Sequence, residues 1–451
     1  MLISVYSTIV RPFLLPSQSS GAGAHGQSRL ARHICDKEAL MTQNTMPKSD
    51  LIIVGGGLNG PALALASANA GLTVTLIDSL PKALRIGDTF DGRGYALSLG
   101  SYKLMKAIGI RDKVAAHAQP ILDVKVTDGK PGEGPAPFML EFRDGEIDES
   151  PMGYMVEDRY IRQAFLEALD AQPKITQIEG EVIAQDVTLH GATVTLSDGT
   201  DISGKLIVGC DGRQSGTALR AGIKRTGWGY GQTALVCAIS HELPHHGAAH
   251  QYFLPSGPLA ILPLPGNQSS IVWTEKDKLA AEIQALSDED YLAVLRPRFG
   301  DFLGEISLAG KRFTYPLNIT LANAFTAPRI ALVGDAAHGM HPISGQGLNA
   351  GLKDVGALTE VLVEAHRRGE DIGREDVLAR YAQWRRFDVA TMALMTDSFN
   401  KLFSNDNPFL RVARDIGMGA VNAMGGLKRA AIREAAGVNG DIPKLLRGVA
   451  L

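Results

Sequence analysis

Residues 51–60 read Leu51-Ile52-Ile53-Val54-Gly55-Gly56-Gly57-Leu58-Asn59-Gly60, a short apolar run that ends in a cluster of glycines. Such a run is typical of a strand buried in a parallel sheet. The next ten residues are rich in Ala and Leu, with Pro61 in the first turn and Gly71 at the end, which predicts a helix over 61–70. The β-branched residues of 73–77 predict a second strand. This part of the chain is therefore expected to form a β-α-β unit.

The glycines of this unit match the GxGxxG pattern at Gly55, Gly57 and Gly60. Glycine lets the backbone approach a pyrophosphate closely, and the helix N-terminus supplies free N–H groups and a partial positive charge. Asp78 ends the second strand, where a carboxylate can bind the hydroxyls of an adenosine ribose. The unit is expected to bind a dinucleotide; the alternative is a plain strand-turn-helix without a nucleotide.

Two later strand-like runs, 205–209 and 329–333, also end in Gly/Asp turns. Parallel strands with glycine-rich turns at their carboxyl ends indicate one sheet with a ligand across its edge. Asp211 follows the first of these runs, and Gly334-Asp335 follows the second. The Asp335 carboxylate can accept hydrogen bonds from a polyol such as a ribityl chain.

The loop after the second turn predicts contact with a flat ring. Pro342 fixes a turn, Gly345 and Gly347 allow close backbone approach, and the helix that follows points its positive end at the ring. This arrangement favours negative charge on a reduced flavin; an ordinary helix start is the alternative. His341 and Gln346 flank Pro342 and are the catalytic candidates in this loop; structural roles are the alternative.

The remaining sequence predicts a second layer and a helical end. Short runs separated by Gly, Pro and Asn between 230 and 320 indicate an antiparallel sheet, and apolar residues recur at helical spacing from Gly347 onward. The predicted division is a disordered extension or mis-assigned start (1–48), an FAD-binding domain (49–125, 151–225 and 310–365), a substrate domain (126–150 and 226–309) and a helical C-terminal region (366–451).

Three of these motifs, in this order, resemble those of flavin-dependent aromatic hydroxylases: the GxGxxG loop, then Asp211-Gly212-Arg213, then Gly334-Asp335-Ala336-Ala337-His338. The stretch from His341 to Asp354, including Asn349, resembles the signature of FAD-dependent ubiquinone-biosynthesis hydroxylases, most closely those of the 2-octaprenyl-6-methoxyphenol hydroxylase type. Segments 91–97, 253–260 and 399–404 agree with it, and the resemblance covers about residues 50–445. Ser344 stands where Ala is expected in relatives. Asp158 stands where many relatives carry Arg or a polar residue, so no cofactor contact is assigned to it.

The resemblance implies an α/β fold of the p-hydroxybenzoate hydroxylase type with bound FAD. Arg93 would lie near the flavin. NADPH or NADH would act as a transient co-substrate, and oxygen would pass from O₂ through a flavin hydroperoxide to the ring of a polyprenyl phenol. No catalytic triad and no metal are expected. A substrate dissolved in the membrane implies a cytoplasmic protein in peripheral contact with the inner face of the membrane, with an assembly of ubiquinone-biosynthesis proteins as a further partner.

Rival functions remain open at this point. A flavin halogenase is expected to show a WxWxIP motif, which Trp228, Trp273 and Trp384 do not form. A prenyl-lipid flavin reductase would consume NAD(P)H without O₂. A non-catalytic FAD-containing scaffold in a biosynthetic assembly would bind FAD without turning over.

The bulk composition excludes several classes. The 451 residues carry a net charge of −3, which gives no broad positive field for nucleic acid. The cysteines Cys35, Cys210 and Cys237 are odd in number and far apart, which favours a reducing compartment. His241, His245, His246 and His250 lack metal-site spacing, so a solvated hairpin loop is expected there. Arg385 and Arg386 are expected on a solvated helix face.

Overall fold

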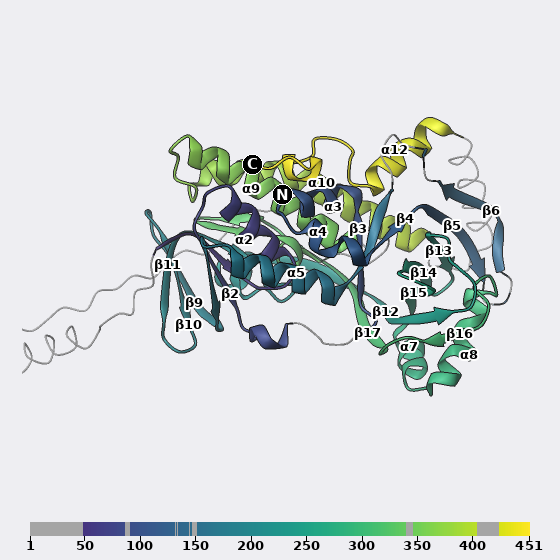
Figure 1. Ribbon diagram of the computed structural model, residues 1–451. Helices are drawn as coiled ribbons and strands as arrows, with labels where there is room; N and C mark the ends of the chain where they lie inside the picture. Colours follow the sequence, from purple (N-terminus) through teal and green to yellow (C-terminus); the bar gives the residue numbers. More distant parts are fainter. Residues whose placement is uncertain are drawn as a thin grey trace, which may run out of the picture. The chain divides into compact units, whose positions relative to one another are not determined.

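The computed structural model describes residues 48–85, 91–130, 132, 134–143, 145–146, 151–339, 346–403 and 424–451. The predictions made for residues 1–47, His341, Pro342 and Gly345, and for the side chain of Gln346, lie outside the described residues. Within the described ranges the strands form three sheets, and helices pack against them (Figure 1).

The β-α-β unit predicted at the start of the ordered chain is present. Its elements are β1 (Ser49–Val54), α2 (Asn59–Asn69) and β2 (Val74–Asp78). The two strands pair in parallel, with Ile53 opposite Leu76. Strand β1 is buried almost throughout, which is why its sequence is a continuous apolar run rather than an alternating one.

The unit belongs to an eight-stranded sheet assembled from distant parts of the chain. The order along its main path is β18-β19-β11-β1-β2-β8, and the β9-β10 hairpin extends from β11. The further strands are β8 (Ile175–Glu179), β9 (Val182–Val187), β10 (Ala192–Leu196), β11 (Asp201–Gly209), β18 (Thr326–Ala327) and β19 (Ile330–Leu332). Strand β11 pairs in parallel with both β1 and β19, so the two later runs join the sheet as predicted.

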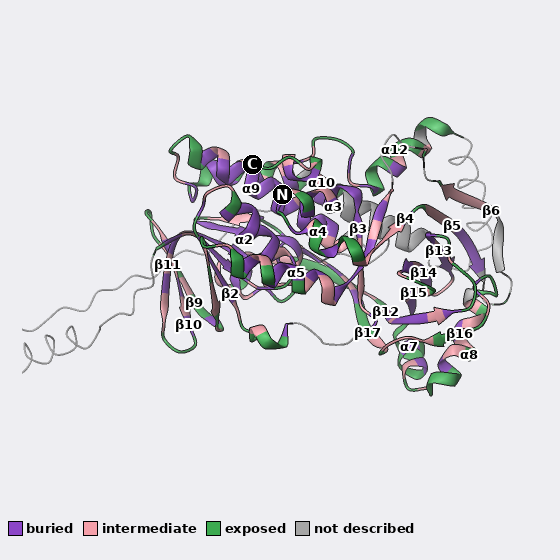
Figure 2. Ribbon diagram, in the orientation of Figure 1, coloured by how far each residue is buried: buried purple, intermediate pink, exposed green. Residues whose placement is uncertain are grey.

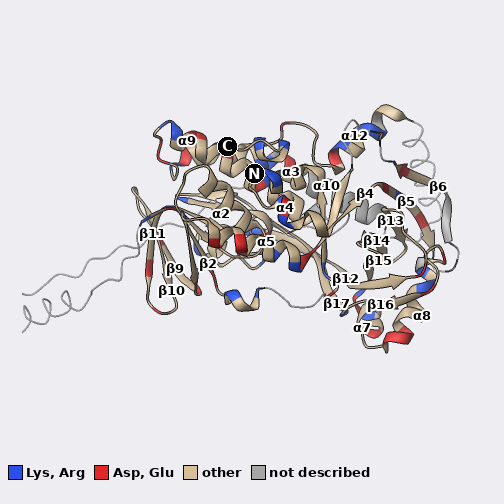
Figure 3. Ribbon diagram, viewed as in Figure 1, with Lys and Arg blue, Asp and Glu red and all other residues tan. Residues whose placement is uncertain are grey.

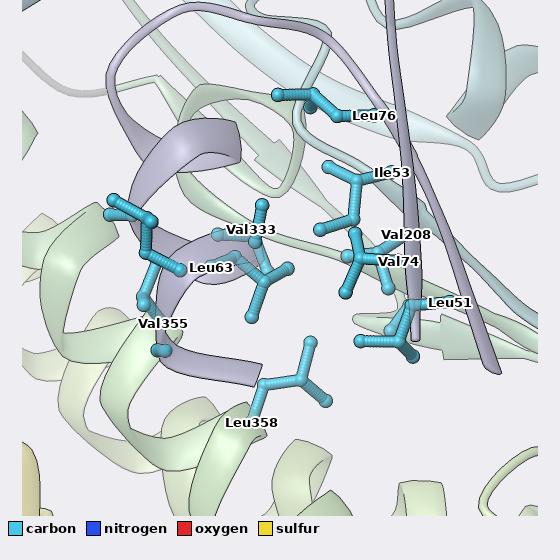
Figure 4. Close-up of a cluster of buried hydrophobic side chains, with 14 of the residues drawn as sticks. Leu51, Ile53, Leu63, Val74, Leu76, Val208, Val333, Val355 and Leu358 are labelled. Carbon is cyan, nitrogen blue, oxygen red and sulfur yellow. The ribbon is translucent and has the colours of Figure 1, made fainter. Parts of the chain in front are cut away.

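The core beside this sheet is built from α2 and α9 (Gln346–Arg367). Figure 4 shows Leu63 of α2 and Leu358 of α9 among the branched side chains of the strands. Leu63, Leu358 and Ile53 are all fully buried, and Figure 2 shows the same burial along α2 and the central strands. Burying each such side chain contributes about 1.5–3 kcal/mol to the stability of the fold. This packing holds in place the strands whose ends carry the motifs.

A second sheet of nine strands confirms the antiparallel layer. Its order is β20-β17-β12-β15-β14-β13-β5-β6, with β16 beside β12. Its strands are β5 (Asp123–Lys130), β6 (Gly134–Phe142), β12 (Arg225–His241), β13 (Ala248–Leu254), β14 (Gly257–Leu264), β15 (Gln268–Lys276), β16 (Ile306–Leu308), β17 (Phe313–Ala322) and β20 (His338–Gly339). One pair, β13 with β5, is parallel. Strand β17 pairs with β12 in this sheet, although residues 310–365 were assigned to the FAD-binding domain. The boundaries between the two domains stay a prediction.

The third sheet is small, with the order β3-β7-β4, and the remaining elements are mostly helical. These are β3 (Gly94–Ser98), β4 (Ala118–Ile121), β7 (Gly153–Glu157), α3 (Leu99–Ala107), α4 (Arg111–Val114), α5 (Asp158–Ala171), α6 (Gly216–Arg220), α7 (Asp277–Gln284), α8 (Asp288–Phe299), α10 (Glu375–Phe403) and α12 (Gly425–Ala435), with short 3-10 turns η1 (Lys82–Leu84), η2 (Ala115–His117), η3 (Gly334–Ala336) and η5 (Lys444–Arg447). No described helix has the length and apolarity needed to cross a bilayer. Figure 3 shows basic and acidic residues interspersed along the described elements.

Arg329 fastens the outer part of the first sheet. Its guanidinium donates to Thr188 O and Lys205 O, both at 2.9 Å, and pairs with Asp371 between α9 and α10. The side chain is 5% exposed. It therefore joins three segments that are far apart in the sequence.

Replacing Arg329 with methionine is expected to lower the free energy of unfolding by about 2–4 kcal/mol, because the carbonyls of Thr188 and Lys205 and the Asp371 carboxylate lose a buried donor. Urea denaturation of the purified variant measures this. Arg374→Met removes an exposed arginine paired with Asp376 and is the matched control, with an expected change below about 1 kcal/mol. Equal losses in the two variants would contradict the assignment.

Candidate FAD site

The glycine loop after β1 combines two constrained glycines with one open one. Gly55 has φ of 110°, and a β-carbon there would lie 2.4 Å from Cys210 O. A β-carbon on Gly60 would lie 1.9 Å from Gly55 O. At Gly57, by contrast, a β-carbon would meet no atom of the described part of the chain within 4 Å. Gly55 and Gly60 therefore shape the turn, while Gly57 leaves room on the side where a ligand would approach the N-terminus of α2.

Asp78 lies against this loop, as its place at the end of β2 predicts. A β-carbon on Gly56 would lie 2.2 Å from Asp78 Oδ2, and the other carboxylate oxygen accepts a hydrogen bond from Leu80 N at 2.8 Å. Arg85 Nε lies 3.9 Å from Oδ2. The carboxylate is thus held beside the loop, where an adenosine ribose attached to a bound pyrophosphate would lie.

The segment after β11 reaches the same loop from the other side. Cys210 N donates to Val54 O at 2.7 Å, next to the contact between Gly55 and the Cys210 carbonyl. The Asp211 carboxylate accepts from Ser215 Oγ at 2.5 Å, Thr217 N at 2.9 Å and Thr217 Oγ1 at 2.8 Å. Asp211 therefore orders the loop before α6. A direct contact between its carboxylate and FAD stays a prediction.

The turn after β19 meets the glycine loop at Asn59. Gly334 has φ of 63°, and a β-carbon there would lie 2.1 Å from Asn59 Nδ2. A β-carbon on Gly351 of α9 would lie 2.4 Å from the same atom. Asn59 of the first motif is therefore inserted between the Gly334-Asp335 turn and α9, which brings segments about 280 residues apart into contact.

Asp335 itself is accessible. Its side chain is 39% exposed and accepts a hydrogen bond from Arg213 Nε at 3.2 Å, while Arg225 Nη2 donates to its backbone carbonyl at 2.7 Å. Arg213 comes from the segment after β11, so the second and third motifs are also joined by a direct ion pair. An accessible carboxylate at a strand end fits the predicted role of binding ribityl hydroxyls.

The start of α9 is tied to β3. Asn349 Oδ1 accepts from Ser98 N at 2.9 Å, and Asn349 Nδ2 donates to Ala96 O at 2.9 Å. A β-carbon on Gly347, two residues earlier, would meet no atom of the described residues within 4 Å. The N-terminus of α9 is therefore held by Asn349 and open at Gly347. The proposed flavin contact of Asn349 stays a prediction.

Arg93 lies where β3 meets α5 and the second sheet. Its guanidinium is 2.7 Å from Asp91 Oδ2 and 3.4 Å from Asp158 Oδ2, and it lies 5.8 Å from the centre of the Phe313 ring. The hydrogen bond with Asp91 raises the pKa of Arg93. Asp158 also accepts from Arg162 at 2.8 Å, which agrees with leaving it out of the cofactor contacts. Arg93 is 39% exposed and remains free to face a ligand on one side.

Two expectations about polar residues were wrong. Arg385 is not on a solvated face: its side chain is 1% exposed and its Nε donates to Asp354 Oδ1 at 2.6 Å, while Arg386 is exposed. The histidines are not all solvated either: His246 is exposed in the loop between β12 and β13, but His241 is buried between Leu243 O and Ser269 Oγ. Burial lowers the pKa of His250 to about 4. No group of three residues able to hold a metal occurs within the described ranges.

Sequence reasoning missed Asn59, His338, Asp354 and Arg385 as parts of this region. The first two lie inside the quoted motifs, and Asp354 ends the signature that carries the family resemblance. Arg385 lies 31 residues after Asp354, and the prediction treated it together with Arg386 as one solvated basic pair. The available signal was Asp354 itself, an acid in the helix that follows the loop predicted to bind the flavin ring.

The arrangement fits FAD. Gly57 and Gly347 have open space, Asp78 and Asp335 are carboxylates at strand ends, and the two ends of the site are joined through Asn59. Asn59 Oδ1 is buried and has no hydrogen-bond partner among the described residues, so an unused acceptor sits in the middle of the region. The glycine loop would hold the pyrophosphate, Asp78 the adenosine ribose, Asp335 the ribityl chain, and the α9 N-terminus the ring.

Comparison with known proteins agrees with this assignment. Residues 48–396 match the family model described as the FAD binding domain. The chain is 45% identical to the ubiquinone hydroxylase UbiL of Rhodospirillum rubrum over 89% of this chain and 94% of that protein. It is 35% identical to the 3-demethoxyubiquinol 3-hydroxylase of Escherichia coli over 87% of this chain and 100% of that protein.

Among solved structures, p-nitrophenol 4-monooxygenase PnpA of Pseudomonas putida matches with a TM-score of 0.72 at 19% identity. The match covers 88% of this chain and 99% of that one, so the fold of the aromatic monooxygenases is shared. The two sequence relatives are more similar in sequence, and their alignments cover 89% and 87% of this chain. The chain therefore belongs to the family of FAD-dependent ubiquinone hydroxylases.

Proposed function

We propose that this chain hydroxylates the aromatic ring of a polyprenyl phenol during ubiquinone biosynthesis, with FAD as bound cofactor and NAD(P)H and O₂ as co-substrates. The observation that carries the proposal is the meeting of three motifs: Asn59 contacts the turn of Asp335, and Arg213 pairs with Asp335. Relatives named as a ubiquinone hydroxylase and a 3-demethoxyubiquinol 3-hydroxylase align with 89% and 87% of this chain, which supports the proposal.

The chain's own residues supply binding and orientation. FAD, when bound, would supply the redox chemistry that links NAD(P)H oxidation to the activation of O₂. The glycine loop fixes the pyrophosphate on backbone N–H groups, and Asp335 fixes the ribityl chain. The N-terminus of α9 places its partial positive charge at the ring end of the site, where it stabilises negative charge on reduced flavin. The nine-stranded sheet is the element on which a ring substrate would be enclosed away from water.

Quinone profiling of a deletion strain tests the proposal. We expect loss of ubiquinone and accumulation of a polyprenyl phenol that lacks one ring oxygen, with recovery on complementation by the wild-type gene. The purified enzyme should then incorporate one atom of ¹⁸O from ¹⁸O₂ into that compound. The position of the new oxygen on the ring identifies the carbon that is hydroxylated.

The same experiment separates the rival functions. A prenyl-lipid reductase would oxidise NAD(P)H under anaerobic conditions and add no ¹⁸O. A scaffold would restore ubiquinone even as the Asp335→Ala variant, which we expect to bind FAD about 10–100-fold more weakly through loss of a charged hydrogen bond. Restoration by Asp335→Ala, with FAD lost, would contradict a catalytic function.

We also propose peripheral contact with the inner face of the membrane, because a polyprenyl tail partitions into the bilayer. Passing such an intermediate between enzymes would be helped by a biosynthetic assembly. Flotation of the purified protein with liposomes that contain polyprenyl phenol measures the contact, and cross-linking followed by co-purification measures the assembly. Protein that stays entirely at the bottom of the gradient would contradict the first proposal.

A further inference from the structure

A buried carboxylate lies directly behind the Gly334-Asp335 turn. Asp354 Oδ2 accepts a hydrogen bond from Gly334 N at 2.9 Å and lies 2.5 Å from His338 Nε2. Gly334 begins the turn η3 (Gly334–Ala336) and His338 follows it, so the two ends of the turn bond to the same oxygen atom of Asp354. The side chains of Asp354 and His338 are 0% exposed.

The other oxygen of Asp354 is held by α10. Arg385 Nε donates to Asp354 Oδ1 at 2.6 Å, and Arg385 Nη1 donates to Asp388 Oδ2 at 2.7 Å. Lys353 Nζ reaches the same Asp388 oxygen at 2.7 Å. Asp354 is thus fixed from both sides, and His338 and Arg385 outweigh the effect of burial and lower its pKa.

Asp354 belongs to α9, the helix whose N-terminus is proposed above to face the flavin ring. Its bonds therefore connect two cofactor-binding segments: the turn that carries Asp335 and the helix that carries Gly347. Asn59 of the glycine loop packs between these two segments, against Gly334 of the turn and Gly351 of α9. Both carboxylate oxygens of Asp354 bond to protein groups, and the side chain is fully buried. We therefore do not expect Asp354 to contact FAD directly.

We infer that Asp354 is a positioning residue, which sets the Asp335 carboxylate at a fixed distance from the α9 N-terminus so that the ribityl chain and the ring are held together. The inference rests on the proposed FAD site. Asp354 holds the turn at both ends, through Gly334 N and through His338, and the left-handed backbone of Gly334 has no side chain of its own to pack there. His338 acts through Asp354 in the same way.

The decisive comparison uses two variants of His338 with similar volume. His338→Gln keeps an N–H donor for Asp354, whereas His338→Leu removes it. We expect His338→Leu to bind FAD about tenfold or more weakly and to change the visible circular dichroism of bound flavin, because the turn is no longer held at both flanks. His338→Gln should stay within about threefold of wild type. In His338→Leu, a larger fraction of NAD(P)H oxidation should reduce O₂ to hydrogen peroxide without hydroxylating the substrate, since the flavin ring is less well placed.

Asp354→Asn is the second probe, and Arg329→Met is the control for general destabilisation. Arg329 forms a buried ion pair away from this turn, so its loss should lower the melting temperature and leave the FAD dissociation constant and flavin spectrum unchanged. If both His338→Leu and Asp354→Asn are less stable but bind FAD with wild-type affinity and spectrum below their melting temperatures, Asp354 is merely structural and the inference is overturned. If wild-type protein binds no FAD, the proposed function itself fails.

Discussion

Replacing Gly57 with valine is expected to weaken FAD binding by at least about 100-fold, or about 3 kcal/mol, while the protein stays folded. The structure leaves more than 4 Å free around a β-carbon at this position, so the apoprotein has room for the new side chain. A bound pyrophosphate would occupy that room, because it has to lie against the backbone N–H groups of the loop. Fluorescence titration with FAD measures the affinity.

Gly426→Val is the matched control, since Gly426 also has open space and lies in α12 away from the glycine motifs. It should bind FAD like wild type. Both variants should keep the far-UV circular dichroism of the parent protein. Wild-type FAD affinity in Gly57→Val would mean that the dinucleotide does not lie on this loop.

Replacing Arg385 with methionine is expected to lower the free energy of unfolding by about 3–5 kcal/mol at neutral pH, because it leaves the Asp354 carboxylate buried with one of its three hydrogen-bond partners removed. Arg385 and Asp354 are 1% and 0% exposed, so solvent cannot replace the lost charge. Guanidinium denaturation measures the loss. Arg386→Met, at the exposed neighbour, should change stability by less than about 0.5 kcal/mol.

The pH dependence of this variant follows from the same ion pair. In the wild type the pKa of Asp354 is lowered, so its stabilising contribution is present above the unfolded value of 3.8 and is lost as the pH falls through the folded value. Without Arg385, burial acts against a weaker opposing charge and raises that pKa relative to wild type. The stability deficit of Arg385→Met should therefore shrink as the pH is lowered from 7 toward 5. A deficit that grows over this range would contradict the assignment.

The fold and the cofactor-binding segments could be predicted from the sequence because their signals are local. A continuous apolar run before Gly55 marks a buried strand, and the same pattern recurs before Asp211 and Asp335. Parallel strands share one edge for their carboxyl ends, so the three motifs had to converge once the strands joined one sheet. The antiparallel layer was predictable for the same reason, from short runs between turn residues.

The supporting contacts were not predictable, because they depend on which helix faces which turn. The pairing of Asp354 with Arg385 joins two helices, and a basic pair on a helix is more often solvated. Asn349 was predicted to contact FAD, and its amide is bonded to β3. Asp211 was predicted in the same role, and its carboxylate orders the start of α6. Hydrogen bonds between distant segments leave no periodicity in the sequence.

Hydrogen–deuterium exchange with and without FAD tests the central claim most directly, since it reports on all the contacting segments at once. We expect one FAD per chain to slow exchange together in peptides that contain Gly57, Cys210 and Asp335, and in the first turn of α9. Protection confined to the Gly57 peptide, with the Asp335 turn and α9 unchanged, would show that the three segments do not share one cofactor.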